Sequence, residues 1–149
     1  MWSVDCAIPD AVYEEAVIKG REYFHLDAEF INEIIAAHVR RVTLFTTQPM
    51  PIGDSTLDRL GAGEREVLGL AYSKYSQDIL DVIVSDDTAF LTVARNLGVP
   101  YVTPRAMIVQ LAQLSLIDHI AAVEAINRMK PYIRWTVFEE AIKDLSETI

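Results

Sequence analysis

The fold class is decided by the stretch Ile79-Leu80-Asp81-Val82-Ile83-Val84-Ser85, which is followed directly by Asp86-Asp87. A near-continuous apolar run that stops abruptly at polar residues is typical of a parallel β-strand covered by helices on both faces. The stretch therefore predicts a buried strand over 79–85, with two acidic residues at its carboxyl end.

Helical patterns lie on both sides of this strand. Apolar periodicity, together with proline, glycine and capping residues at the ends, predicts helices at 9–20, from about 27, from 61, at 88–97, from 103, at about 118–129, and from a capping box at Thr136. The second of these carries His38 on its apolar stripe. Shorter strands are expected at 41–45 and 99–102. Strands that alternate with helices predict a three-layer α/β/α fold with a mainly parallel sheet, in one domain over 1–149.

The composition narrows the class of protein. The chain has 149 residues, of which 51% are hydrophobic, and a net charge of −9 from 22 acidic and 13 basic residues. This balance disfavours disorder and a broad basic nucleic-acid surface. No apolar run approaches the ~20 residues of a membrane helix and no signal core is seen, so we expect a cytoplasmic protein with no membrane partner. Cys6 is the only cysteine, which excludes an intramolecular disulfide and a thiolate cage.

Several acidic residues occupy positions that suit ligand binding. Asp86 and Asp87 follow a strand, where open α/β sheets bind ligands. Glu64 begins a helix behind a glycine-rich turn, and one of Glu14 and Glu15 is expected near an apolar helix face. Helix capping or solvation explains Asp86, Asp87 and Glu64 taken singly. A partly buried glutamate at 14 or 15 instead needs a partner or a metal. Together they are the hard oxygen ligands that Mg²⁺ or Mn²⁺ prefers.

The order of these motifs resembles the PIN domain superfamily, in particular prokaryotic proteins related to toxin–antitoxin nucleases. The similarity spans the chain from about residue 8 onward. The segments that carry it are Ile8-Pro9-Asp10-Ala11-Val12-Tyr13-Glu14-Glu15, Gly63-Glu64-Arg65-Glu66-Val67-Leu68-Gly69-Leu70-Ala71, Ile83-Val84-Ser85-Asp86-Asp87 and Ala94-Arg95-Asn96-Leu97-Gly98.

The resemblance implies a metal-dependent ribonuclease. It assigns catalytic and metal-binding roles to Glu15, Glu64 and Asp86, with Asp87 as a fourth metal ligand. Mg²⁺ or Mn²⁺ would activate water for attack on single-stranded RNA, and a toxin homologue would have an antitoxin protein as partner. Two alternatives stay open: a catalytically inactive relative that serves as an oligomerisation or protein-binding module, and a regulatory module that binds a small ligand at the strand ends.

The chain departs from the family pattern at its amino end. PIN domains begin with an apolar strand that ends in aspartate, and only seven residues precede Ile8. Val4-Asp5-Cys6 leaves no room for the crossover that parallel strands need, so Asp5 is a weak substitute for that aspartate. We therefore expect an N-terminally truncated PIN-like fold. An apolar strand edge exposed by this loss predicts a homodimer or higher oligomer.

Overall fold

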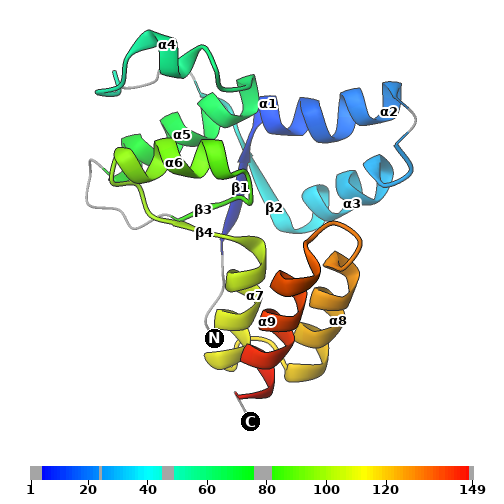
Figure 1. The fold of residues 1–149 in the computed structure, drawn as a ribbon. Helices are drawn as coiled ribbons and strands as arrows, with labels where there is room; N and C mark the ends of the chain where they lie inside the picture. Colours follow the sequence, from blue (N-terminus) through cyan, green and yellow to red (C-terminus); the bar gives the residue numbers. More distant parts are fainter. Residues whose placement is uncertain (1–4, 24, 45–48, 76–81, 148–149) are drawn as a thin grey trace. The chain divides into compact units, whose positions relative to one another are not determined.

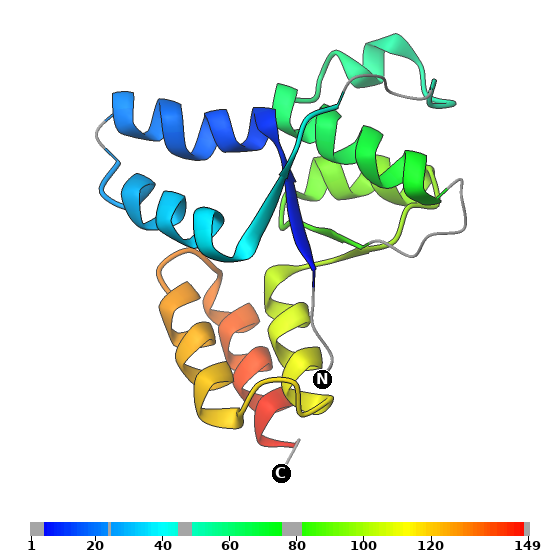
Figure 2. The same cartoon turned by 180° about the vertical axis from the view of Figure 1, so that it is seen from behind.

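The computed structural model describes residues 5–23, 25–44, 49–75 and 82–147. The chain divides into two compact units, each described here by itself. The first contains residues from Ser3–Ile83 and Asp87–Tyr101, and the second contains Val84–Asp86 and Val102–Ile149. Figures 1 and 2 show the chain from opposite sides. The expectation of one domain over 1–149 stays a prediction.

The first unit opens with a pair of parallel strands. Strand β1 (Cys6–Pro9) pairs with β2 (Val39–Val42) in a register that runs from Cys6 opposite Val39 to Pro9 opposite Val42. The two strands lie side by side in Figures 1 and 2. Residues 10–23 and 25–38 belong to the helical crossover that parallel strands require. Our prediction of a strand at 41–45 was therefore placed about two residues too late, and Phe45 lies outside the described residues.

The crossover begins as one continuous helical segment. It consists of α1 (Asp10–Tyr13), the π-helix η1 (Glu14–Lys19) and α2 (Gly20–Glu22). Gly20 was expected to end this helix, but the helix continues through it. A Cβ atom on Gly20 would lie 3.1 Å from the Cβ of Ala28, so this glycine permits close packing of α2 against the next helix.

The next helix, α3 (Ala28–His38), has only part of its apolar stripe buried. Ala28 and Ile35 are buried, whereas Phe30, Ile34 and His38 are exposed. The prediction that His38 lies on a buried face was wrong, because the packed face of α3 is narrower than the apolar stripe in its sequence.

The remaining elements of the first unit surround an apolar core. They are α4 (Asp54–Leu57), α5 (Ala62–Tyr75) and α6 (Thr88–Asn96), with Leu60, Leu68, Ile83, Phe90, Leu91, Ala94 and Val99 buried between them. Helix α6 is followed by Gly98 with a φ of 71°, the left-handed conformation predicted there. Figure 1 shows α5 and α6 side by side.

The strand predicted at 79–85 is short in the part of the chain that the structure describes. Strand β3 (Ile83–Val84) pairs with β4 (Tyr101–Val102). The amides of Ile83 and Ser85 donate to the carbonyls of Pro100 and Val102 respectively, a progression that makes the pair parallel. Ile83 is buried, but Val82 and Val84 are about half exposed. The prediction of a strand covered on both faces is therefore wrong over 82–85, and residues 79–81 lie outside the described part.

The second unit contains a three-helix bundle. Helices α7 (Pro104–Gln113), α8 (His119–Met129) and α9 (Trp135–Ser146) bury Val109, Ala112, Ala122, Ile126, Ala141 and Leu145. Thr103 caps α7 through its side chain, which confirms the helix start predicted there, and Asp118 caps α8, whose start was predicted at about 118. The prediction of a capping box at Thr136 was wrong, because the N-cap of α9 is Arg134, two residues earlier, and Arg134 forms no side-chain capping bond.

The structure is α/β, mostly helical with small parallel sheets, and is consistent with a PIN-like fold. Among the described residues no helix is long and apolar enough to span a membrane.

Candidate functional site

Two of the predicted site residues meet at the turn before α5. Glu64 accepts a hydrogen bond from the Gly61 amide through Oε2 at 2.8 Å. Glu15, on η1, accepts one from the Gly63 amide through Oε1 at 3.2 Å. These amides belong to the start of α5, where backbone N–H groups lack partners within the helix. The structure thus brings Glu15 and Glu64 to one glycine-containing turn.

Gly63 permits this approach because it has no side chain. A Cβ atom there would lie 2.7 Å from Glu15 Oε2 and 3.2 Å from Val12 Cγ2. Gly63 is itself buried, whereas Glu15 is exposed. Our prediction that Glu14 or Glu15 is partly buried was wrong, since both are exposed. They fall in a π-helix, whose wider turns alter the faces expected from α-helical spacing.

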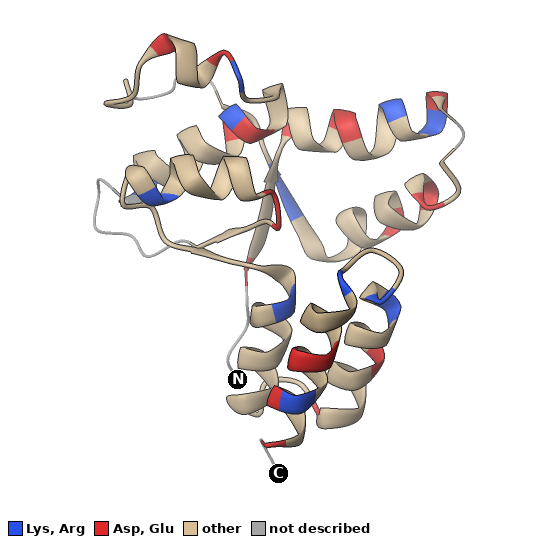
Figure 3. Ribbon diagram, in the orientation of Figure 1, with Lys and Arg blue, Asp and Glu red and all other residues tan. Residues whose placement is uncertain are grey.

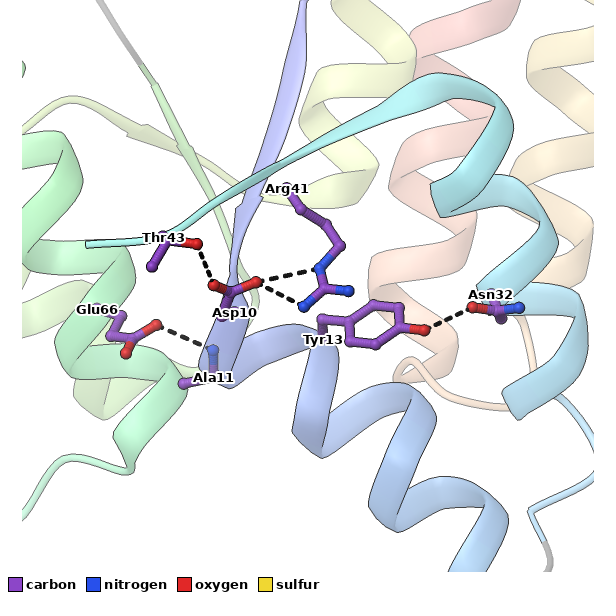
Figure 4. Close-up of polar contacts among 7 residues, drawn as sticks. All are labelled: Asp10, Ala11, Tyr13, Asn32, Arg41, Thr43 and Glu66. Atoms are coloured by element: carbon purple, nitrogen blue, oxygen red, sulfur yellow. Dashed lines mark hydrogen bonds and ion pairs between the residues drawn. The ribbon is translucent and has the colours of Figure 1, made fainter. Parts of the chain in front are cut away.

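Glu66 is a structural partner that the sequence interpretation missed. Its Oε2 accepts a hydrogen bond from the Ala11 amide at 2.9 Å, at the start of α1 (Figure 4). Helix α5 thus supplies an acceptor to α1, while Glu15 on η1 supplies one to α5. A signal was present in the sequence: Pro9 at the N-cap of α1 has no side-chain acceptor, so a first-turn amide needs one from elsewhere.

A second polar network joins β2 to the crossover helices (Figure 4). Asp10 Oδ1 accepts from Arg41 Nη2 at 2.6 Å and from Nε at 3.1 Å, and Oδ2 accepts from the Thr43 hydroxyl. The Arg41 guanidinium lies 3.8 Å from the ring centre of Tyr13, whose hydroxyl donates to Asn32 Oδ1. The Thr43 hydrogen bond and then Arg41 hold the pKa of Asp10 below its usual value. Both carboxylate oxygens of Asp10 therefore accept hydrogen bonds from side chains of the fold.

The two adjacent aspartates differ in their surroundings. Asp87 Oδ1 accepts from the Phe90 amide at 2.8 Å and caps α6. Asp86 is exposed, follows β3 and belongs to the second unit. Helix capping, the alternative reading of this pair, therefore applies to Asp87.

Asp87 and Glu64 line the same cavity within the first unit. The cavity has a volume of about 460 Å³ and is open to solvent, and its polar lining also includes Arg59, Thr56 and Thr92. Glu15 does not line it. Two of the predicted acids are therefore gathered around one cavity together with a cation.

Asp5 makes a local contact at the first strand pair. Its Oδ2 lies 3.2 Å from Arg40 Nη2, and both side chains are largely exposed. Within the described residues, this contact joins Asp5 to β2. Its role as a substitute ligand stays a prediction.

The donor types suit a divalent ion of the magnesium class. Mg²⁺ binds through one or two carboxylates, retains several waters and takes further oxygens from substrate phosphates. Glu64 and Asp87 supply such a carboxylate pair at one cavity. Among the described residues, no group of three or more His, Cys, Asp or Glu side chains is arranged to hold a metal. The four-acid set of Glu15, Glu64, Asp86 and Asp87 stays a prediction.

Comparison with known families identifies the fold class. The PIN domain family DUF3368 matches the chain over residues 3–147, and the chain therefore belongs to the PIN domain family. This confirms the resemblance found in the sequence and extends it toward the amino end. No curated protein and no solved structure was found to match the chain.

Proposed function

We propose that this PIN domain protein is a Mg²⁺- or Mn²⁺-dependent nuclease that cuts single-stranded RNA. The observation that carries the proposal is that Glu64 and Asp87 line one open cavity with Arg59. Two carboxylates and a cation at one cavity match the needs of phosphoryl chemistry, in which a metal and a positive side chain offset phosphate charge. Membership of the PIN domain family supports the same chemistry.

In this proposal Glu64 and Asp87 hold the metal. A metal held there would supply neutralisation of the phosphate charge and activation of water. The Gly61 amide orients Glu64 through Oε2 and leaves Oε1 for a ligand. Arg59 neutralises a phosphate oxygen from the cavity wall.

Glu15 and Asp86 have supporting roles in the proposal. Glu15 accepts from the Gly63 amide, directly before Glu64, and thereby fixes the turn that presents Glu64. Asp86 is adjacent to Asp87 in the chain and exposed, and its part in the proposal rests on the family resemblance.

The test combines cleavage with metal binding. A fluorescently labelled single-stranded RNA is incubated with the protein in Mg²⁺, Mn²⁺ or EDTA, and Mn²⁺ binding is followed by calorimetry. Glu64→Gln and Asp87→Asn should each reduce cleavage at least 100-fold and weaken Mn²⁺ binding. Asn still caps helices, so Asp87→Asn preserves the start of α6.

Glu66→Gln is the matched control, since it changes a nearby glutamate on the same helix while keeping an acceptor for the Ala11 amide. It should retain cleavage. Cleavage that persists in both Glu64→Gln and Asp87→Asn overturns the assignment.

An inactive PIN domain that acts as an oligomerisation module is the second candidate. It is favoured by the half-exposed Val82 and Val84 on β3 and by the lack of a three-carboxylate group among the described residues. Sedimentation at micromolar concentration distinguishes the two. A stable dimer without cleavage or Mn²⁺ binding supports this candidate, and a monomer that cuts RNA excludes it.

A further inference from the structure

The connection between α8 and α9 differs in character from the rest of this acidic chain. With the last two residues of α8 and the first of α9, it reads Arg128-Met129-Lys130-Pro131-Tyr132-Ile133-Arg134-Trp135 and contains three of the 13 basic residues and none of the 22 acidic ones. We call Arg128, Lys130, Tyr132, Arg134 and Trp135 the basic–aromatic turn. Figure 3 shows the blue segments on either side of this connection in the second unit.

The aromatic side chains of this turn are unusually exposed. Tyr132 is 82% exposed and Trp135 is 55% exposed. Leaving a large aromatic surface in water forgoes the free energy that its burial would contribute. Pro131, at the centre of the connection, has a fixed φ, and the Tyr132 amide donates to the Met129 carbonyl at 2.9 Å. The turn thus presents these rings on an ordered backbone.

Trp135 is held in a defined position although its ring is more than half exposed. Its ring centre lies 5.4 Å from that of Phe138, and the Lys130 ammonium lies 4.8 Å from the Trp135 ring centre. These contacts fix one part of the indole and leave the rest for a ligand. An exposed aromatic surface beside a cation is suited to a ligand that combines a planar base with a negatively charged phosphate.

The basic residues of the turn have no acidic partner within the described part of the chain, although Lys130 also contacts the Trp135 and Phe138 rings. Arg128, Lys130 and Arg134 are exposed, and within the described part of the chain none of them forms an ion pair. By contrast, Arg105 in the same bundle lies near Glu140 and Asp144. The turn therefore offers uncompensated positive charge on a protein whose net charge is −9.

We propose that the basic–aromatic turn binds single-stranded RNA by stacking unpaired bases on Trp135 and Tyr132, while its cations contact the phosphates. Exposed aromatic rings flanked by Lys and Arg are the elements by which proteins bind single strands without sequence preference. A duplex keeps its bases stacked inside the helix and presents none to these rings. The choice of RNA as the ligand rests on the proposed function. The inference adds a substrate-binding surface whose residues are distant in sequence from Glu64 and Asp87.

A second copy of this chain fits the turn less well. Stable protein interfaces bury about 800 Å² on each partner, more than an eight-residue segment supplies. The turn is also small and dominated by cations, whereas dimer interfaces are apolar and depleted of charge at their centre.

The test measures binding separately from cleavage. The full chain is titrated against a fluorescein-labelled 12-nucleotide oligouridylate in EDTA, with fluorescence anisotropy as the readout, and a duplex RNA of equal length is the comparison. Trp135→Ala and Tyr132→Ala should each weaken binding about tenfold, within the range typical for loss of one stacked base. Trp135→Phe should restore most of the affinity. Arg134→Gln should weaken binding and lower the salt dependence by about one phosphate contact.

Tyr23→Ala is the matched control, since Tyr23 is also strongly exposed but lies in the first unit. It should bind like the unsubstituted protein. Equal affinity for the duplex, or affinities of Trp135→Ala and Tyr132→Ala equal to that of Tyr23→Ala, overturns the inference. So does a change in sedimentation on Trp135→Ala without loss of RNA affinity, which assigns the turn to self-association. Loss of affinity in a protein that never cleaves supports the turn and refutes the nuclease, because binding is measured without metal.

Discussion

The acidic region around α1 and the start of α5 contrasts with the basic–aromatic turn between α8 and α9. In the acidic region Glu15, Glu64 and Glu66 each accept a hydrogen bond from a backbone amide, and Asp10 is bound by Arg41 and Thr43. In the turn, the cations stand outside ion pairs within the described residues, and the aromatic rings are exposed. Polar groups engaged by the backbone stabilise the fold, whereas those left in water are available to a ligand.

The largest effect on stability is expected from Gly63→Ala. The new Cβ atom would approach Glu15 Oε2 to 2.7 Å and Val12 Cγ2 to 3.2 Å, so Glu15 must give up its bond to the Gly63 amide. We expect a loss of about 2 kcal/mol in the free energy of unfolding, as is typical of overpacking, measured by urea denaturation.

Gly61→Ala is the control for this substitution, because its Cβ atom would meet only Glu64 Oε2 at 3.6 Å. Its effect should be small. In a double-mutant cycle, Gly63→Ala should cost less in the presence of Glu15→Ala. Strict additivity would show that Glu15 and Gly63 do not constrain one another.

A smaller loss is expected from Glu66→Ala. This change leaves the Ala11 amide without the acceptor that Glu66 provides from α5, and an unsatisfied, partly buried donor costs about 1 kcal/mol or slightly more. Urea denaturation should show the loss, and Glu66→Gln should recover most of it. Equal destabilisation by Ala and Gln would mean that charge, rather than the acceptor, is what matters.

The effect of Asp10→Asn should depend on pH. The Thr43 hydroxyl and Arg41 lower the pKa of Asp10 in the folded protein, so the ionised carboxylate stabilises the fold above the unfolded-state pKa of about 4. This stabilisation is lost as the pH falls through the lowered folded-state pKa. Asp10→Asn should therefore reduce Tm at pH 7, and the difference from the unsubstituted protein should narrow below about pH 4. A difference that is constant from pH 7 to pH 3 would contradict this account.

The smallest effect on stability is expected in the basic–aromatic turn. Lys130→Gln removes an exposed cation that contacts the Trp135 and Phe138 rings, an interaction worth about 0.5 kcal/mol at such a site. Thermal unfolding should be nearly unchanged while oligouridylate binding weakens. A large loss of stability would contradict the contrast between the acidic region and the basic–aromatic turn, because Lys130 would then be a residue that stabilises the fold.

Local sequence signals predicted the helices well. Thr103 and Asp118 identified the starts of α7 and α8, and Gly98 identified the end of α6, because caps and left-handed turns depend on nearby residues. The same signals failed at Thr136, since a capping pattern one residue inside a helix looks like a cap in sequence alone. The strand at 79–85 was overestimated in the described part because apolar residues at 82 and 84 indicate burial only if another element covers them.

The assignment of Glu15, Glu64, Asp86 and Asp87 to one site stays a prediction. The structure shows that Glu15 and Glu64 both accept hydrogen bonds from amides of the turn before α5. Glu66 was missed because its partner, the Ala11 amide, is 55 residues away, and sequence spacing carries no information about such a contact. The importance of Gly63 as a close-packing residue was hidden for the same reason.

The sequence by itself determined that this chain is a helical α/β protein of the PIN domain family, because periodicity, caps and motif order are properties of neighbouring residues. Only the tertiary structure decided which polar groups are used by the fold. An acidic residue looks the same in the sequence whether its carboxylate caps a distant helix or is free to bind a ligand. Only the position of its hydrogen-bond partners in the folded chain distinguishes the two.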